Sequence, residues 1–179
     1  PLPHVLAAKA VAFREANRPE FRDYQKAIVV NARALAAALV KRGITVATGG
    51  TDNHLMLIDV RPFGLTGRQA ESAVRDCGIT LNRNSLPFDP NGPWYTSGLR
   101  IGTPAATTLG MKEPEMDEIA EALALVLKST KPEVSKGKPS KAKFVIEEKA
   151  RGEAQGRIQR LLARFPVYPQ LDLGLLKEF

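Results

Sequence analysis

The sequence predicts an α/β domain in which helices pack on a short, mostly antiparallel sheet, followed by a basic linker and a helical tail. Three observations predict this arrangement. Apolar residues recur at three- and four-residue steps in several long segments, and they alternate in four short ones. Residues 129–143 are rich in Lys, Pro, Ser and Gly but poor in large apolar residues. We therefore expect a domain over residues 1–128, a flexible linker over 129–143 and a helical extension over 144–179.

The chain begins with two predicted helices. Apolar residues between 4 and 16 cover more than one face of the first, so we expect much of it to be buried. Pro19 and Glu20 suit the first turn of the second helix. Gly43 is placed to adopt the left-handed conformation that ends it.

Next come two predicted strands, at 44–48 and 54–60, with turn-forming residues between them. They could pair as a hairpin, and the largely apolar second strand is expected to lie centrally in the sheet. A capping box from Thr66 to Gln69 then predicts the start of a helix.

The segments after this helix predict two more strands and two more helices. We expect strands at 79–81 and 98–102, and a polar connector after residue 105. A helix is predicted from Glu113 onward, with acidic residues in its first turn. Residues 144–165 return to helical spacing with an apolar stripe, which consists of Ile158, Leu161, Leu162 and Phe165.

Composition excludes several kinds of protein. The 179 residues carry a net charge of +7 and a single cysteine, so an internal disulfide and a cysteine-based zinc site are both excluded. Cys77 falls on the apolar side of a predicted helix and is expected to be a buried thiol, which fits the cytoplasm. No apolar run is long enough to span a membrane. A nucleic-acid interface at the lysine-rich linker would require steeply salt-dependent binding, and no recognition motif accompanies it.

The start of the chain predicts that it is part of a longer protein. It reads Pro-Leu-Pro-His, without an initial Met and without the basic and apolar regions of a signal peptide. A natural chain seldom begins in this way.

Motifs for nucleotide or zinc-hydrolase chemistry are lacking, and we expect no catalytic residue and no metal ligand in this chain. Arg100, between Leu99 and Ile101 on a predicted strand, either meets water or binds an anion such as a carboxylate. Trp94, in a loop rich in Pro and Gly, is either a core anchor or a flat wall for a planar ligand. Asn84 could cap a turn or bind the polar edge of a ligand.

The segment from Asn82 to Ala105 closely resembles the C-terminal domain of serine hydroxymethyltransferases. The similar strings are N-R-N-S-L-P from Asn82, G-P-W at 92–94 and T-S-G-L-R-I-G-T-P-A from Thr96. Upstream, G-G-T-D-N-H-L from Gly49, L-T-G at 65–67 and the opening P-L-P-H-V are similar to the same family. The resemblance extends over residues 1–128 without an obvious gap.

The resemblance implies a fold and an activity. It implies the small domain of a fold-type I pyridoxal 5'-phosphate enzyme, which interconverts serine plus tetrahydrofolate with glycine plus 5,10-methylenetetrahydrofolate. Such enzymes are homodimers or homotetramers. In this sequence Arg100 would bind the substrate carboxylate. The folate would contact Asn84, Gly92, Pro93 and Trp94, although the family often has Phe at the position of Trp94.

The resemblance also implies that the catalytic part lies elsewhere. The family's Schiff-base lysine belongs to a T-T-H-K segment of the N-terminal domain, and this chain has no such segment. The chain is therefore expected to be inactive alone. The apolar sides of its first helices, which would pack on the missing domain, are expected to be exposed here. A non-enzymatic module that binds folate or docks to a complete protomer is the alternative.

Overall fold

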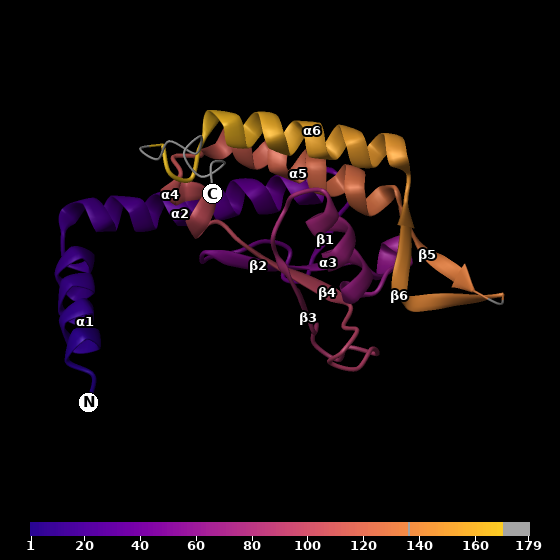
Figure 1. The fold of residues 1–179 in the computed structure, drawn as a ribbon, viewed down its shortest axis with the longest axis horizontal. Coiled ribbons are helices and arrows are strands. Elements are labelled where there is room, and N and C mark those ends of the chain that lie inside the picture. The colour runs from indigo at the N-terminus through magenta and orange to yellow at the C-terminus, as the bar shows by residue number, and fades with distance from the viewer. Residues whose placement is uncertain (136, 170–179) are drawn as a thin grey trace, which may run out of the picture.

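The computed structural model describes residues 1–135 and 137–169, and it confirms the predicted α/β class. Four antiparallel strands form one sheet in the order β1-β2-β4-β3, and helices α2, α3 and α5 pack on one side of it (Figure 1). Lys136 of the predicted linker and residues 170–179 of the predicted extension lie outside the described residues. Of the described helices, none has the length and apolar character to cross a membrane.

Two helices precede the sheet, and a hairpin and a long helix follow it. In chain order the elements are α1 (Pro3–Ala16), α2 (Pro19–Lys41), β1 (Thr45–Val46), β2 (Leu55–Asp59), the 3-10 turn η1 (Arg61–Phe63), α3 (Gly67–Asp76), β3 (Asn82–Asn84), β4 (Gly98–Gly102), α4 (Pro104–Thr108), α5 (Glu113–Lys128), β5 (Thr130–Ser135), β6 (Lys138–Ile146) and α6 (Glu148–Arg164).

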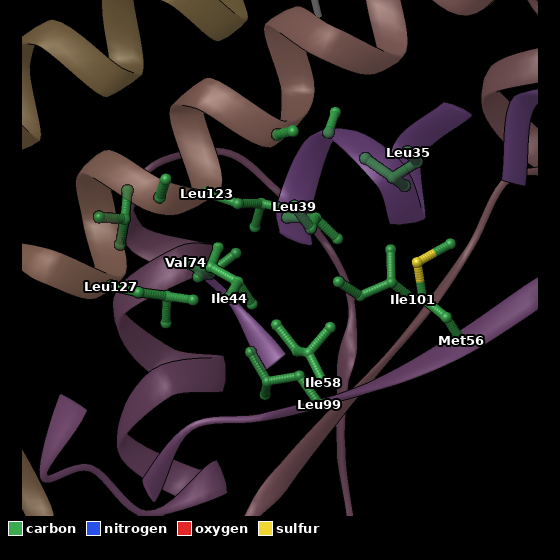
Figure 2. Packing of buried hydrophobic residues seen from close by; sticks show 14 of the residues in the cluster. Leu35, Leu39, Ile44, Met56, Ile58, Val74, Leu99, Ile101, Leu123 and Leu127 are labelled. Carbon is green, nitrogen blue, oxygen red and sulfur yellow. The ribbon is translucent and has the colours of Figure 1, made fainter. Parts of the chain in front are cut away.

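The hydrophobic core lies between the sheet and helices α2, α3 and α5. Alternate residues of β2 and β4 enter it, and the register places Met56 beside Ile101 and Ile58 beside Leu99. The helices contribute apolar stripes that meet these strands (Figure 2). Each large side chain buried here contributes about 1.5 to 3 kcal/mol relative to an exposed one. The core thus fixes β4 and the direction of its outward side chains.

The local signals in this part of the chain gave the correct elements. Gly43 has φ +80° directly after α2, and β1 and β2 form the predicted hairpin with β2 central. The Thr66–Gln69 capping box is present at the start of α3. Backbone conformation and side-chain chemistry therefore agree at these positions.

Helix α1 forms as predicted. The burial expected from its apolar pattern alone is wrong, whereas the exposure expected of a helix that packs on a missing domain agrees with the structure. It has no buried residue, and the side chain of Phe13 is 72% exposed. Figure 1 shows α1 projecting away from the rest of the fold, beyond the start of α2. Its apolar side chains therefore face water because no described element packs over them.

Two predictions around the sheet differ from the structure. Residues 79–81 are not a strand; β3 begins at Asn82 and pairs with β4 over three residues only. The predicted polar connector contains the short helix α4. Pro104 suits the first turn of that helix, and Tyr24 Oη donates to Pro104 O at 3.3 Å. This tertiary contact with α2 is invisible in local composition.

Residues 129–143, predicted as a flexible linker, instead contribute to the antiparallel hairpin β5–β6. Its backbone carbonyls are bound by side chains of the distant α3 segment. Thr66 Oγ1 donates to Lys141 O at 2.8 Å, and Gln69 Nε2 donates to Ser140 O and Lys143 O, both at 2.7 Å. These hydrogen bonds stabilise a segment that has few large apolar residues to bury. The division of the chain at 128/129 itself stays a prediction.

The C-terminal helix is shorter than predicted. Residues 144–146 belong to β6, and α6 begins at Glu148. Ile158 and Leu161 are buried against the domain, as expected from the apolar stripe, whereas Leu162 is exposed. Helix α6 lies alongside α5, so the extension packs on the first domain (Figure 1).

Candidate functional site

Strand β4 carries Arg100 on the face of the sheet opposite the core. Leu99 and Ile101 point into the core, so alternation directs Arg100 the other way. The register places Leu57 on one side of Arg100 and Asn82 on the other. Arg100 thus presents an exposed guanidinium on an open face of the sheet. Its binding of an anion stays a prediction.

The guanidinium of Arg100 is held from one side. Its Nε donates to Asn82 Oδ1 at 3.0 Å. Among the described residues, no carboxylate forms a salt bridge with it, although the chain has several Arg–carboxylate pairs elsewhere. One bound edge orients the planar group and leaves its other donors for a ligand. Two parallel N–H···O bonds to a carboxylate are the usual use of such a geometry.

A hollow of about 570 Å³ adjoins Arg100. It is lined by residues 78–82, by residues 100–103 at the end of β4, and by apolar side chains of α2, α5 and α6. The hollow therefore lies between the sheet and these helices, next to the unpaired residues 79–81. The polar residues that line the hollow include Arg100, Asn82 and His54, and most of the other lining residues are apolar. An apolar hollow with a few convergent polar groups is typical of a small-molecule site.

The loop between β3 and β4, residues 85–97, covers the neighbouring part of the same open face. Leu86 is buried over Gly98, and a β-carbon at Gly98 would lie 2.7 Å from Leu86 Cδ2. Gly98 and Arg100 are two residues apart on one strand and share a face, so they are separated by about 7 Å. The loop and the guanidinium are therefore adjacent parts of one surface.

The carboxylate of Asp89 organises this loop. Oδ1 accepts from Asn91 N at 2.9 Å and from Ser97 Oγ at 2.6 Å, while Oδ2 accepts from Leu86 N at 3.0 Å and Ser97 N at 2.8 Å. Burial alone would raise the pKa of Asp89, but these hydrogen bonds outweigh it and hold the pKa below its ordinary value. The ionised carboxylate thus joins both ends of the loop to its middle.

Two residues of the loop have left-handed backbone conformations that are unfavourable for them. Phe88 and Thr96 both have φ +55°. Thr96 Oγ1 is buried and, within the described residues, has no hydrogen-bond partner. Such strain persists only where surrounding contacts enforce it, and it is often found at ligand-binding sites. The hydrogen bonds of Asp89, together with the bond from Gly67 N to Thr96 O, are the contacts that surround these residues here.

Trp94 is 61% exposed, and two guanidinium groups lie close to its ring. The Cζ atoms of Arg68 and Arg83 are 5.2 Å and 5.6 Å from its ring centroid. Cation–π contacts of this kind orient the ring without burying it. Of the two interpretations of Trp94, a core anchor is therefore wrong, and a flat wall for a planar ligand stays a prediction.

The other residues of the predicted folate set lie on the same loop or on β3. Asn84 shares the open face with Arg100, since alternate residues of β3 point the same way, and its Nδ2 donates to Ser85 O at 2.8 Å. Gly92 and Pro93 are exposed at the outer part of the loop. Their backbone hydrogen bond from Tyr95 N to Gly92 O, at 3.0 Å, closes the turn that precedes β4.

Two further predictions, on Cys77 and on metal ligands, concern residues outside this loop and β4. Cys77 is buried, and desolvation, followed by the charge of Asp76, raises the pKa of its thiol. This matches a structural thiol rather than a nucleophile. Over residues 1–135 and 137–169 there is no group of three or more metal-ligating side chains.

Sequence reasoning missed Asp89, Arg68 and Arg83. Asp89 had a weak signal, because Asp followed by Pro-Asn-Gly is typical of a turn in which the carboxylate accepts backbone N–H groups. The two arginines had none, since they lie 26 and 11 residues from Trp94 and meet it only in the fold.

Comparison with known proteins gives one consistent result. The family model described as serine hydroxymethyltransferase matches residues 1–123. The serine hydroxymethyltransferase of Treponema pallidum is 58% identical over 178 residues, which cover 99% of this chain and 31% of that protein. Those of Salinispora tropica and Cutibacterium acnes are 54% and 53% identical, and each alignment covers 97% of this chain. The chain spans 37% and 36% of these two relatives, so about a third of the length of the proteins it matches.

Proposed function

We propose, from the premise that this chain belongs to the serine hydroxymethyltransferase family, that it is the C-terminal part of such an enzyme. In this role it supplies the residue that binds the substrate carboxylate and the residues that contact folate. The reaction is the interconversion of serine plus tetrahydrofolate with glycine plus 5,10-methylenetetrahydrofolate.

The observation that carries this proposal is the geometry of Arg100. Its Nε is fixed by Asn82, its remaining donors face an open surface, and a hollow adjoins it. A serine or glycine carboxylate bound by two parallel hydrogen bonds would be oriented as well as held. Orientation of a small substrate against reacting groups on another domain is a large contribution to rate.

The folate contacts follow from the loop of residues 85–97. The exposed part of the Trp94 indole would lie against a planar ring, with the guanidinium groups of Arg68 and Arg83 beside it. The amide of Asn84 could offer a donor and an acceptor to the polar edge of that ring. Gly92 and Pro93 would lie against the same ligand. Asp89 holds the whole loop in place before any ligand arrives.

Pyridoxal 5'-phosphate does not fit the described residues alone. The residues that line the hollow beside Arg100 include neither a lysine that could form a Schiff base nor a carboxylate that could face the pyridine nitrogen. The cofactor supplies the electron sink of this chemistry, and other parts of the enzyme must attach it. The isolated chain is accordingly proposed to be inactive.

Assembly with other protein is part of the proposal. The family implies homodimers or homotetramers, and the exposed apolar side chains of α1 support a surface that is covered in the complete enzyme. The single buried Cys77 supports a reducing compartment such as the cytoplasm.

The carboxylate role is tested in the complete enzyme that contains this chain. Arg100→Ala should weaken transition-state stabilisation by about 2 to 5 kcal/mol, because a charge-assisted pair is lost. Arg100→Lys should recover only part of this, since a lysine cannot form the planar pair. A serine KM near that of wild type in Arg100→Ala would contradict the assignment.

The folate role can be tested on the chain itself by calorimetry with tetrahydrofolate. Asn84→Ala and Trp94→Ala should each weaken binding, whereas Arg33→Ala, remote in sequence and exposed, should not. Serine cleavage by the purified chain would contradict the proposed inactivity. Folate binding without turnover in any longer form would favour the non-enzymatic module.

A further inference from the structure

We propose that the β5–β6 hairpin positions the loop of residues 85–97, acting through the first turn of α3 and through Lys141. The hairpin lies beyond the residues that the family model matches. Its contribution to ligand binding rests on the proposed folate role of the loop. Its contribution to loop order does not.

The first connection joins the hairpin to α3. Gln69 uses both ends of its amide: Oε1 accepts from Thr66 N at 2.9 Å, and Nε2 donates to Ser140 O and Lys143 O at 2.7 Å each. Thr66 Oγ1 donates to Lys141 O at 2.8 Å. Gln69 is fully buried, so these bonds have no water to replace them. The hairpin and the helix start are thus fixed to each other.

The second connection joins the same turn of α3 to the loop. Gly67 N donates to Thr96 O at 3.0 Å, and Arg68 N donates to Tyr95 O at 2.9 Å. The approach is close, because a β-carbon at Gly67 would collide with Thr96 Oγ1 and lie 2.7 Å from Gly98 O. Any shift of this turn is therefore transmitted to the end of the loop, next to Trp94.

A direct contact runs parallel to this route. Lys141 Nζ donates to Asn91 Oδ1 at 3.4 Å and lies 5.8 Å from the centroid of the Tyr95 ring. Asn91 in turn donates from Nδ2 to Ser97 Oγ at 3.0 Å, within the group of atoms around Asp89. One hairpin side chain therefore contacts the middle of the loop, while the hairpin backbone supports its end through α3.

The test uses the full chain and needs no ligand for its first readout. Trp94 is the only Trp, so its fluorescence reports on this loop alone. Gln69→Glu keeps the acceptor for Thr66 N but loses both donations to the hairpin. Lys141→Gln removes the direct contact, and Lys138→Gln removes the same charge from the same strand without a contact to the loop.

Gln69→Glu should raise the exchange rates of the Ser97 and Leu86 amide protons about tenfold or more, because both hydrogen bonds from Gln69 to the hairpin are lost. Lys141→Gln should change the emission of Trp94, and Lys141→Arg should restore it. Lys138→Gln should behave as wild type. Circular dichroism checks that each variant is folded. If Gln69→Glu does not fold, the variants of the exposed Lys141 still test the proposal.

Tetrahydrofolate titration separates the two proposals. Weaker binding in Lys141→Gln than in Lys138→Gln supports both. No binding by wild type, together with the expected changes in exchange and emission, overturns the folate role and leaves the positioning role supported. Wild-type exchange and emission in folded Gln69→Glu and Lys141→Gln would overturn the positioning role.

Discussion

Helix α1 and the loop of residues 85–97 both present aromatic side chains to water, yet they are held in opposite ways. The loop is fixed by four hydrogen bonds to Asp89 and by backbone bonds to α3. Helix α1 has no buried residue. Exposure at a fixed site indicates a preformed contact surface, whereas exposure on an unsupported helix indicates a surface that another part of the protein covers.

The largest effect is expected from Asp89→Ala. It leaves the N–H groups of Leu86, Asn91 and Ser97 without their acceptor, and it should lower the free energy of unfolding by about 2 to 3 kcal/mol. Urea unfolding followed by Trp94 fluorescence and by circular dichroism measures this. Asp52→Ala, whose carboxylate is exposed, is the matched control. Equal behaviour of the two variants would mean that the loop is not fixed by Asp89.

Acid should release the loop of residues 85–97. The pKa of Asp89 is lowered in the folded chain, so its stabilisation is complete above the unfolded value of about 3.9 and is lost as pH falls through the lower folded value. Trp94 emission should be constant from pH 5 to 8 and change below about pH 4. Asp89→Asn should remove this transition; its persistence in that variant would assign the transition to another group.

A smaller effect, in this case an increase in the free energy of unfolding, is expected at Phe88. Its backbone is left-handed and its side chain is fully exposed. Phe88→Gly should raise the free energy of unfolding by about 0.5 to 1 kcal/mol, because relief of strain exceeds the entropy cost of glycine. Phe88→Ala keeps the strain and loses no packing, so its midpoint of thermal unfolding should equal that of wild type. A destabilised Phe88→Gly would show that the strain is absent.

The smallest change in stability is expected in α1. Phe13→Ser should leave the free energy of unfolding unchanged, since the side chain contacts no core. It should reduce self-association at high concentration, measured by sedimentation velocity, because an exposed apolar surface is removed. Arg14→Ser on the same helix is the control. Lower stability of Phe13→Ser would contradict this, because it would mean that α1 packs against the rest of the domain.

The predictions that succeeded depend on neighbouring residues. The alternation around Arg100 gave both the bounds of β4 and the outward direction of the guanidinium. The Thr66–Gln69 spacing gave the start of α3. In each case the information lies within a few residues, where periodicity and capping chemistry operate.

The predictions that failed depend on distant partners. The hairpin at 130–146 is stabilised by Thr66 and Gln69, more than 70 residues earlier, so its own composition resembles that of a linker. The burial expected from the apolar pattern of α1 failed because none of the described elements packs over its apolar faces. Asp89 is recognisable only when both ends of the loop are seen to meet at its carboxylate.

The short outer strands of the sheet limit how this protein can assemble. β1 has two residues and β3 has three, so neither offers a long row of free backbone groups to another chain. Along β6, carbonyls are already bound by Thr66 and Gln69. At the edges of the four-stranded sheet, pairing with a strand of another chain, a common route to aggregation, therefore has little template. A partner that contacts this sheet would do so mainly through side chains.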